Sequence, residues 1–490
     1  MFHISDLKKY NRCPILYLKD QEIDKQDYQQ YVRYDEQVTL LAVQKLGIQN
    51  YFLGERNDPK ERALAALNTY DWLVKARFEY GDLRVKVPFL HKVGNTYDLY
   101  FLFLGLYPMT TDMQFYTDTV WVLEKNHIYL RNIYIIHLNA NYERGKKLDV
   151  NELFTISNTF YTVNKNPSIS VKESIEQNKV DLTDLLEIMN ACSIDTVKKP
   201  KRTNKCTGRN KCRYYSECFE EEKLPDNSIL HLCGSQHRYD MQKDGIEYLK
   251  DANIDLIEGS KMQYAQILAD KNGGLFVDKM ALRSWLSTIS YPITFLDFEW
   301  ERFAIPPYEK MHPFDVLPFE YSLHIMQEDG SIEHKVFLSI HDDRKELATS
   351  LANDIPGSGS VIAYNAFGAE YIRIQEMIDT FPELNEPLTS INERMIDLQL
   401  PFESGVIYDT RMKGLWSLKV IMSMMNDKSY SDLAIHQGMD AVYEWRRLDK
   451  EEEVNKEDII NNLKAYCGMD TYAMTVVYKW LLNLLSNETN

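Results

Sequence analysis

The order of apolar and polar residues predicts both strands and helices along the whole chain. In the first half, short apolar runs at residues 83–90, 95–108 and 132–140 predict strands among helical segments. From Tyr291 onward, strand patterns precede helical patterns, and a last helical run continues to Leu485. Alternation of this kind favours an α/β fold with a mixed sheet.

The same patterns divide the chain into three parts. We expect a first domain at residues 1–222, a helical connector at 223–290 and a second domain at 291–490. A chain of 490 residues, 44% of them apolar, is long enough for domains with separate hydrophobic cores.

Composition narrows the class of protein. The chain contains no apolar run of about 18 residues, and its start lacks the apolar core of a signal peptide, so we expect a cytoplasmic protein without a membrane partner. The net charge of -17 argues against a surface that binds nucleic acid nonspecifically, although a local basic channel remains compatible with it.

Two carboxylates interrupt the apolar strand pattern ITFLDFEW at residues 293–300. Asp297 and Glu299 are two residues apart, so their side chains project from the same face of a strand. An unpaired charge is unfavourable in a buried strand, and a divalent cation with a preference for oxygen ligands would neutralise both groups.

A second polar pair lies in the last helical pattern. Tyr466 and Asp470 are four residues apart in LKAYCGMDTYAM, so both side chains lie on one face of the helix. Each motif alone is common by chance. Their order and their strand-then-helix context make a shared metal site the better interpretation.

Together the D-x-E and Y-x-x-x-D motifs resemble the DnaQ-like exonucleases of the DEDD superfamily, in the tyrosine-bearing subclass, which have an RNase H-like fold. The resemblance implies that Asp297, Glu299, Glu370 and Asp470 bind two Mg²⁺ or Mn²⁺ ions and that Tyr466 orients the attacking water. Glu370 follows the predicted strand GSVIAYN in the sequence and takes the place of the usual Asp after a one-residue shift. Asp397 falls where this fold often has an acid that is not a ligand.

Residues 285 to 485 also resemble the bacterial family catalogued as domain of unknown function 2779, through AYN, RMIDLQLPF, GLWSLKVIM and YSDLAIHQGMDA. The implied activity is metal-dependent hydrolysis of phosphodiester bonds, as a 3′–5′ exonuclease on single-stranded ends of DNA or RNA. The alternative is a noncatalytic nucleic-acid-binding or assembly protein in DNA repair or defence.

The first half resembles a different group of nucleases. ISDLKKYNRCPILYL and CTGRNKCRYYSEC are similar to RecB-like and CRISPR-associated nucleases of the PD-(D/E)XK fold that carry a four-cysteine iron-sulfur cluster. The resemblance implies a [4Fe-4S] cluster held by Cys13, Cys206, Cys212 and Cys218, with Zn²⁺ as the rival. Cys192, Cys233 and Cys467 are expected to be core residues.

This first domain lacks the catalytic pattern of such nucleases. Val87 or Pro88 stands where an Asp is expected, and residues 99–108 contain neither an acid nor a Lys. Asp98 is the nearest carboxylate. We therefore expect a degenerate version of the nuclease fold that has a nucleic-acid-binding or structural role.

A basic segment surrounds two of these cysteines. Residues 197–213 contain eight Lys or Arg and no acid. We expect phosphate contacts from seven of them. They are Lys199, Lys201, Arg202, Lys205, Arg209, Lys211 and Arg213.

Overall fold

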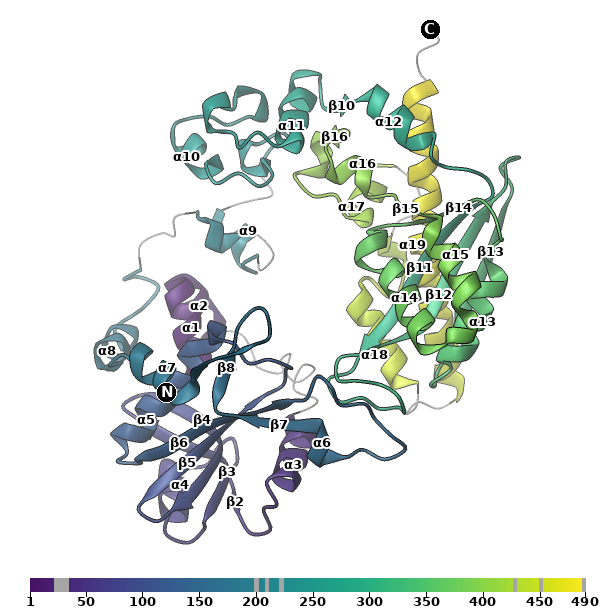
Figure 1. The fold of residues 1–490 in the computed structure, drawn as a ribbon. Coiled ribbons are helices and arrows are strands. Elements are labelled where there is room, and N and C mark those ends of the chain that lie inside the picture. Colours follow the sequence, from purple (N-terminus) through teal and green to yellow (C-terminus); the bar gives the residue numbers. More distant parts are fainter. Residues whose placement is uncertain are drawn as a thin grey trace. The chain divides into compact units, whose positions relative to one another are not determined.

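The computed structural model describes residues 1–21, 35–197, 202–207, 211–219, 224–425, 430–448 and 453–486. The chain divides into two compact units (Figure 1). The first contains residues 1–219 and 303–315, and the second contains residues 220–302 and 316–490. Each unit has mixed sheets and helices, so the expected α/β class is confirmed.

The first unit is built on a seven-stranded sheet in the order β2-β3-β4-β5-β6-β7, with β1 beside β4. The β2–β3, β5–β6 and β1–β4 pairs are parallel, and the other neighbours are antiparallel. Its strands are β1 (Phe2–His3), β2 (Phe52–Leu53), β3 (Trp72–Tyr80), β4 (Leu83–Val93), β5 (Thr96–Phe103), β6 (Leu130–Leu138) and β7 (Phe154–Ser157). A separate hairpin joins β8 (Thr159–Tyr161) to β9 (Pro167–Ser170).

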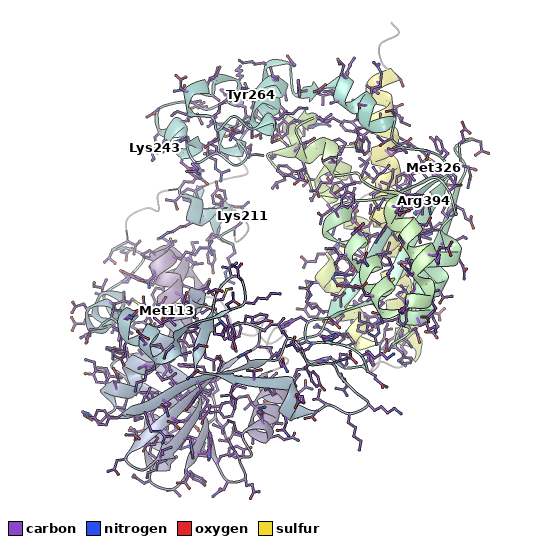
Figure 2. The ribbon with its side chains drawn as sticks, viewed as in Figure 1. Met113, Lys211, Lys243, Tyr264, Met326 and Arg394 are labelled. Carbon is purple, nitrogen blue, oxygen red and sulfur yellow. The ribbon has the colours of Figure 1, made fainter. Side chains whose placement is uncertain are left out.

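Helices cover both faces of this sheet because its strands carry apolar residues on both sides. The larger core includes Leu73, Val85 and Leu99 with Val120 of α5, whose first residue, Met113, is labelled in Figure 2. The other core packs Val74 and Phe89 against α3 and α6. The helices are α1 (Ile4–Arg12), α2 (Pro14–Gln21), α3 (Asp35–Lys45), α4 (Lys60–Ala66), α5 (Met113–Lys125), α6 (Val150–Leu153), α7 (Val171–Asn178), α8 (Thr183–Asn190) and α9 (Tyr215–Phe219).

The second unit is built on a five-stranded mixed sheet in the order β13-β12-β11-β14-β15. The β13–β12 and β12–β11 pairs are antiparallel, whereas β11–β14 and β14–β15 are parallel. Its strands are β11 (Ile293–Arg302), β12 (Val316–Met326), β13 (Ile332–Leu338), β14 (Ser360–Ala363) and β15 (Met395–Asp397). Met326, the last residue of β12, and Arg394, which precedes β15, are labelled in Figure 2.

The central strand β11 divides its apolar residues between two cores. Leu296 and Phe298 pack on the face that is covered by α13 (Arg344–Asp354), α14 (Glu370–Thr380) and α15 (Asn385–Glu393). Ile293 and Phe295 pack on the opposite face, against α19 (Glu453–Ser486). Asp297 and Glu299 continue this second row, because side chains two residues apart share a face.

The predicted connector at residues 223–290 groups with the second unit. Its β10 (Leu275–Val277) pairs antiparallel with β16 (Ile407–Asp409), and its apolar residues join the core around α19. The remaining helices of this unit are α10 (Arg238–Lys243), α11 (Lys261–Lys271), α12 (Lys279–Leu286), α16 (Leu400–Glu403), α17 (Leu418–Ser423) and α18 (Gly438–Arg447). Among the helices that the structure describes, none is long and apolar enough to cross a membrane.

Candidate metal centre

Helix α19 carries the Y-x-x-x-D motif and packs against β11, the strand that carries the D-x-E motif. Buried residues recur along α19 at Ile459, Leu463, Cys467, Met474 and Val477, a spacing of three to seven that forms one helical face. This face packs on β11 and β12. Tyr466 and Asp470 are therefore carried to the same side of the sheet as Asp297 and Glu299.

Three carboxylates converge there. Donor oxygens of Asp297, Glu299 and Asp470 all lie within 4.8 Å of one another. Within the described ranges, this is the one group of at least three His, Cys, Asp or Glu residues with donor atoms so close. Glu299 is buried, and Asp297 and Asp470 are partly buried.

Glu370 reaches the same region from the other side of the sheet's central strands. It is the first residue of α14, which follows β14 and the short 3-10 helix Ala366–Gly368. Its side chain is buried, and its Oε2 has no hydrogen-bond partner. Its charge interacts with those of Asp297, Glu299 and Asp470, but Glu370 is not part of the group of donor atoms within 4.8 Å of one another.

Burial and mutual repulsion favour the protonated forms of these acids in the metal-free protein. Burial, followed by Asp470, raises the pKa of both Asp297 and Glu299 well above the ordinary values. Burial, followed by Asp397, raises the pKa of Glu370 to about 8. Burial raises the pKa of Asp470 to about 6, against a hydrogen bond from Tyr430 and the charge of Lys419.

Two residues that the sequence analysis did not single out support Tyr466 and Asp470. Lys419 Nζ, on α17, donates to Tyr466 Oη at 3.0 Å and lies 4.9 Å from the ring centres of both Tyr466 and Tyr430. Tyr430 Oη donates to Asp470 Oδ1 at 2.6 Å. Both lie in segments quoted for the family resemblance, GLWSLKVIM and YSDLAIHQGMDA, which was the signal available in the sequence.

Two further polar side chains border the acids. Asp397 Oδ1 accepts the backbone N–H groups of Asn365 and Gln399 at 3.0 and 2.9 Å, so this carboxylate fixes the loop after β14. Cys467 is fully buried, as expected of a core residue, and its Sγ lies 3.6 Å from Asp297 Oδ2.

The residues present fit divalent cations. Carboxylate oxygens are the ligands that Mg²⁺ prefers in proteins, and Mn²⁺ accepts the same set. The unpartnered Oε2 of the buried Glu370 is the kind of atom that a cation would satisfy. Binding would also remove the repulsion that holds protons on these acids.

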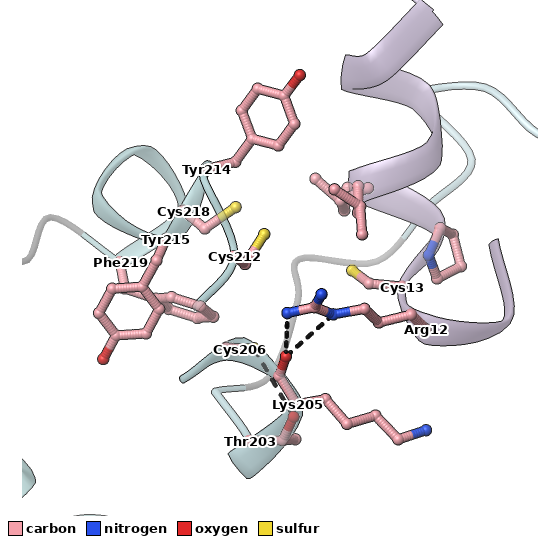
Figure 3. A pocket seen from close by; sticks show the side chains of 13 residues that line it. Arg12, Cys13, Thr203, Lys205, Cys206, Cys212, Tyr214, Tyr215, Cys218 and Phe219 are labelled. Carbon is pink, nitrogen blue, oxygen red and sulfur yellow. Dashed lines mark hydrogen bonds between the residues drawn. The ribbon is translucent and has the colours of Figure 1, made fainter. Parts of the chain in front are cut away.

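The four predicted cluster cysteines surround one cavity in the first unit (Figure 3). Cys13 lies between α1 and α2, and Cys206, Cys212 and Cys218 come from the segment that ends in α9. The cavity has a volume of about 530 Å³. Burial, then the neighbouring Cys212, raises the pKa of the Cys218 thiol, and Cys13 and Cys206 act in the same direction.

The distances between the cysteine sulfur atoms can be compared with those in a zinc site. A single tetrahedral Zn²⁺ with bonds of about 2.3 Å to sulfur holds its ligands about 3.8 Å apart. In the described part of the chain, no three cysteine sulfur atoms lie within 4.8 Å of one another. Apolar side chains, including Ile15, Leu16 and Phe219, also line the cavity. The described sulfur atoms are thus spaced more widely than the four ligands of one tetrahedral zinc ion.

The described basic residues near these cysteines make contacts within the first unit. Arg213 binds Asp20, and its guanidinium lies 5.3 Å from the ring centre of Tyr214. Arg202 lies 4.7 Å from the ring centre of Phe219, and Lys211 Nζ lies 5.0 Å from that of Tyr215. Lys205 is exposed at the cavity. The expected phosphate contacts of Lys199, Lys201 and Arg209 lie outside the described residues.

Asp98 of the first unit is committed to an ion pair. Arg131 Nε donates to its Oδ1 at 2.9 Å, and Asn132 donates to the same oxygen at 3.1 Å. Val87 and Pro88 are buried in β4. The nearest carboxylate to the expected nuclease site is thus already neutralised.

The fold and the acids define a mixed α/β protein with a partly buried carboxylate cluster on the five-stranded sheet of its second unit. Residues 294–417 match the family described as "Domain of unknown function (DUF2779)". This confirms the resemblance for a segment that contains Asp297, Glu299 and Glu370 and ends before Tyr466 and Asp470.

No curated protein matches the sequence. Among solved structures, the chain is similar to the family B DNA polymerase from the hyperthermophilic archaeon Pyrobaculum calidifontis, at 10% identity and a TM-score of 0.26. That match covers 40% of this chain and 24% of the polymerase.

Proposed function

We propose that the second unit is a metal-dependent nuclease that removes nucleotides from the 3′ end of single-stranded DNA or RNA. The observation that carries this proposal is the convergence of Asp297, Glu299 and Asp470 within 4.8 Å, beside a buried Glu370 with an unpartnered oxygen. The DnaQ-like resemblance supplies the polarity and the RNase H-like interpretation of the fold.

The four acids would hold two divalent cations. Such ions, about 3.5 to 4 Å apart, activate water and stabilise the leaving oxygen in phosphodiester hydrolysis. In the described contacts, Lys419 donates to Tyr466 and to no carboxylate, while its charge favours the ionised form of Asp470.

Tyr466 would orient the water or a phosphate oxygen as a hydrogen-bond donor. Its Oη accepts from Lys419 Nζ, so its own proton remains available for donation. Burial, then Asp470, raises the pKa of Tyr466 above its ordinary value. The phenol therefore stays protonated at neutral pH, which suits a positioning role and excludes a general base.

We also propose that Cys13, Cys206, Cys212 and Cys218 hold a [4Fe-4S] cluster that fixes the start of the first unit to its end. The cavity that these cysteines share and the wide spacing of their sulfur atoms support this proposal. The cluster would supply covalent cross-links through its iron–sulfur bonds. Arg202, Lys205 and Lys211 would then lie on a segment that the cluster holds in place, where they are suited to phosphate contacts.

The test of the nuclease proposal is degradation of single-stranded DNA and RNA labelled at the 5′ end, with Mn²⁺ or Mg²⁺. The native chain is expected to give a ladder of shortening labelled products, and Asp297→Asn is expected to give none. Asp329→Asn is the matched control, because Asp329 lies in the exposed turn after β12 and contacts Ser331.

Other outcomes have distinct meanings. Binding of both strands without shortening would favour the noncatalytic binding protein. Release of a labelled mononucleotide would show that the enzyme degrades the strand from its 5′ end. Equal degradation by native protein and Asp297→Asn would place catalysis in the first unit and overturn the proposal.

The cluster proposal is tested by anaerobic purification. We expect iron and acid-labile sulfide at about four atoms each per chain, and their loss in Cys212→Ser. Zinc at one atom per chain without sulfide would contradict it.

A further inference from the structure

We propose that Glu320 is a fifth carboxylate of the metal centre and takes part in binding divalent cations. The inference deepens the proposed function and rests on it for the identity of the centre. Neither the D-x-E motif nor the Y-x-x-x-D motif includes this residue, which lies on the neighbouring strand β12.

The register of the sheet places Glu320 beside a proposed ligand. Glu320 lies directly opposite Glu299 in the antiparallel β11–β12 pair. Residues opposite each other project from the same face, with Cβ atoms about 4.5 to 5.5 Å apart. The pairing shifts between Glu299 and Trp300, so a bulge follows this pair. Bulges often redirect side chains next to functional sites.

The side chain of Glu320 is buried without a partner. The residue is 0% exposed, and neither carboxylate oxygen accepts or donates a hydrogen bond. Lys464 is the nearby cation, but it lies on an exposed position of α19. Cys467, which contacts Asp297, also interacts with the charge of Glu320.

Apart from the proposed ligands Asp297 and Glu299, other polar residues on this face of β12 and β11 are hydrogen-bonded. Ser322 Oγ lies 2.8 Å from Thr471 Oγ1, and His324 Nδ1 lies 2.8 Å from the same hydroxyl. Glu301, which is 2% exposed, forms two hydrogen bonds with Arg446. Glu320 is the exception among these neighbours, which points to a ligand as its missing partner.

Like charges directly opposite on adjacent strands destabilise a sheet, and a buried ionised carboxylate without a hydrogen-bond partner adds a further penalty. Cations between Glu299, Glu320 and the other acids would offset both effects. Two carboxyl groups that are held protonated in the metal-free chain could therefore both ionise in the metal-bound chain. Glu320 can act by direct ligation or through a water held by the ion.

The experiment compares Mn²⁺ binding by the full chain and by Glu320→Gln, measured by titration calorimetry. We expect the affinity to fall about tenfold or more. The matched control is Asp118→Asn, because Asp118 of the first unit is also buried with one unpartnered oxygen. This control is expected to bind Mn²⁺ as the native chain does.

Thermal unfolding distinguishes loss of metal binding from loss of structure. In EDTA, the midpoint for Glu320→Gln is expected to equal or exceed that of the native chain, because the substitution breaks no hydrogen bond of the buried Glu320 side chain. Addition of Mn²⁺ should raise the native midpoint more than that of the variant. Mn²⁺ affinity within twofold of native would overturn the inference. If Glu320→Gln does not fold, Glu320→Asp shifts the carboxylate by one methylene, and native affinity in that variant would overturn it equally.

The two proposals can fail separately. If Mn²⁺ binding depends on Glu320 but the native chain degrades neither DNA nor RNA, the proposed function fails and the inference stands. If the native chain degrades a strand and Glu320→Gln binds Mn²⁺ normally, the inference alone fails. A native chain that binds no Mn²⁺ overturns both.

Discussion

Lys419 connects the two tyrosines of the candidate centre to its acids. Its ammonium lies between the rings of Tyr430 and Tyr466, at 4.9 Å from each ring centre, and it donates to Tyr466 Oη. Cation–π contacts of this kind fix the position of a lysine. The same charge opposes the rise in the pKa of Asp470 that burial causes. Lys419 therefore orients the phenol and lowers the repulsion among the acids.

We expect Lys419→Met to reduce the rate of strand degradation at saturating substrate by tenfold or more. The variant keeps Tyr466 but removes the hydrogen bond that orients its hydroxyl group. Lys345→Met is the control, because Lys345 forms an exposed ion pair with Glu383. The measurement is kcat and KM for single-stranded DNA. An effect on KM alone would assign Lys419 to substrate binding.

A residue of the first unit makes its stability depend on pH. Burial raises the pKa of Asp118 on α5 from 3.8 to about 6. The folded state therefore binds this proton more tightly than the unfolded state. Its contribution to stability is complete below pH 3.8 and is lost as the pH rises through 6.

Asp118 should thus lower the free energy of unfolding by about 1 kcal/mol between pH 5 and pH 8. Asp118→Asn is expected to remove that part of the pH dependence. Urea unfolding of both chains at the two pH values measures it. An identical change in the two chains would show that Asp118 does not titrate in this range.

At the scale of elements, the turn from β14 to α14 decides where Glu370 lies. Asn365 has the left-handed backbone conformation, with φ 61° and ψ 39°, and its side chain folds over Gly368. A Cβ atom on Gly368 would lie 2.5 Å from Asn365 Oδ1. A Cβ atom at this position would therefore displace the Asn365 side chain, and α14 begins two residues later.

Gly368→Ala is expected to destabilise the second unit by about 1 to 3 kcal/mol and to weaken Mn²⁺ binding, because Glu370 would move with the turn. The control is Gly357→Ala, since a Cβ atom there meets nothing within 4 Å. Thermal unfolding and Mn²⁺ titration measure the two effects. Unchanged Mn²⁺ affinity in a folded Gly368→Ala chain would show that the turn accepts the methyl group without moving Glu370.

At the scale of the whole molecule, the proposed groups belong to units with separate cores. The cysteine cavity lies in the first unit, and the acids lie in the second. Effects of substitutions at distant sites without shared partners add independently. Loss of one group should therefore leave binding at the other unchanged.

We expect Cys212→Ser to lower the unfolding temperature of the first unit and to leave the Mn²⁺ affinity of the chain unchanged. Asp297→Asn should lower the Mn²⁺ affinity of the chain and leave the iron content and the unfolding temperature of the first unit unchanged. Iron analysis and Mn²⁺ titration of both variants test this independence. Loss of Mn²⁺ binding in Cys212→Ser would show that the two units are coupled.

The sequence alone determined the elements that carry the candidate site. Period-two alternation placed Asp297 and Glu299 on one face of a strand, and a four-residue spacing placed Tyr466 and Asp470 on one face of a helix. Both patterns are local, because they depend on the geometry of a few consecutive residues. Family resemblance added Glu370 and the four cysteines, which no local pattern would have joined.

Only the tertiary structure decided which distant residues lie together. Glu320 meets Glu299 through strand register, and Lys419 and Tyr430 reach Tyr466 and Asp470 through the packing of segments that are separated by about 40 residues or more. The same reasoning that identified Asp297 and Glu299 would have identified Glu320 in PFEYSLHI as a charged residue in an apolar strand. The sequence could not have shown that Glu320 pairs with Glu299, because register and helix packing depend on the burial of whole faces.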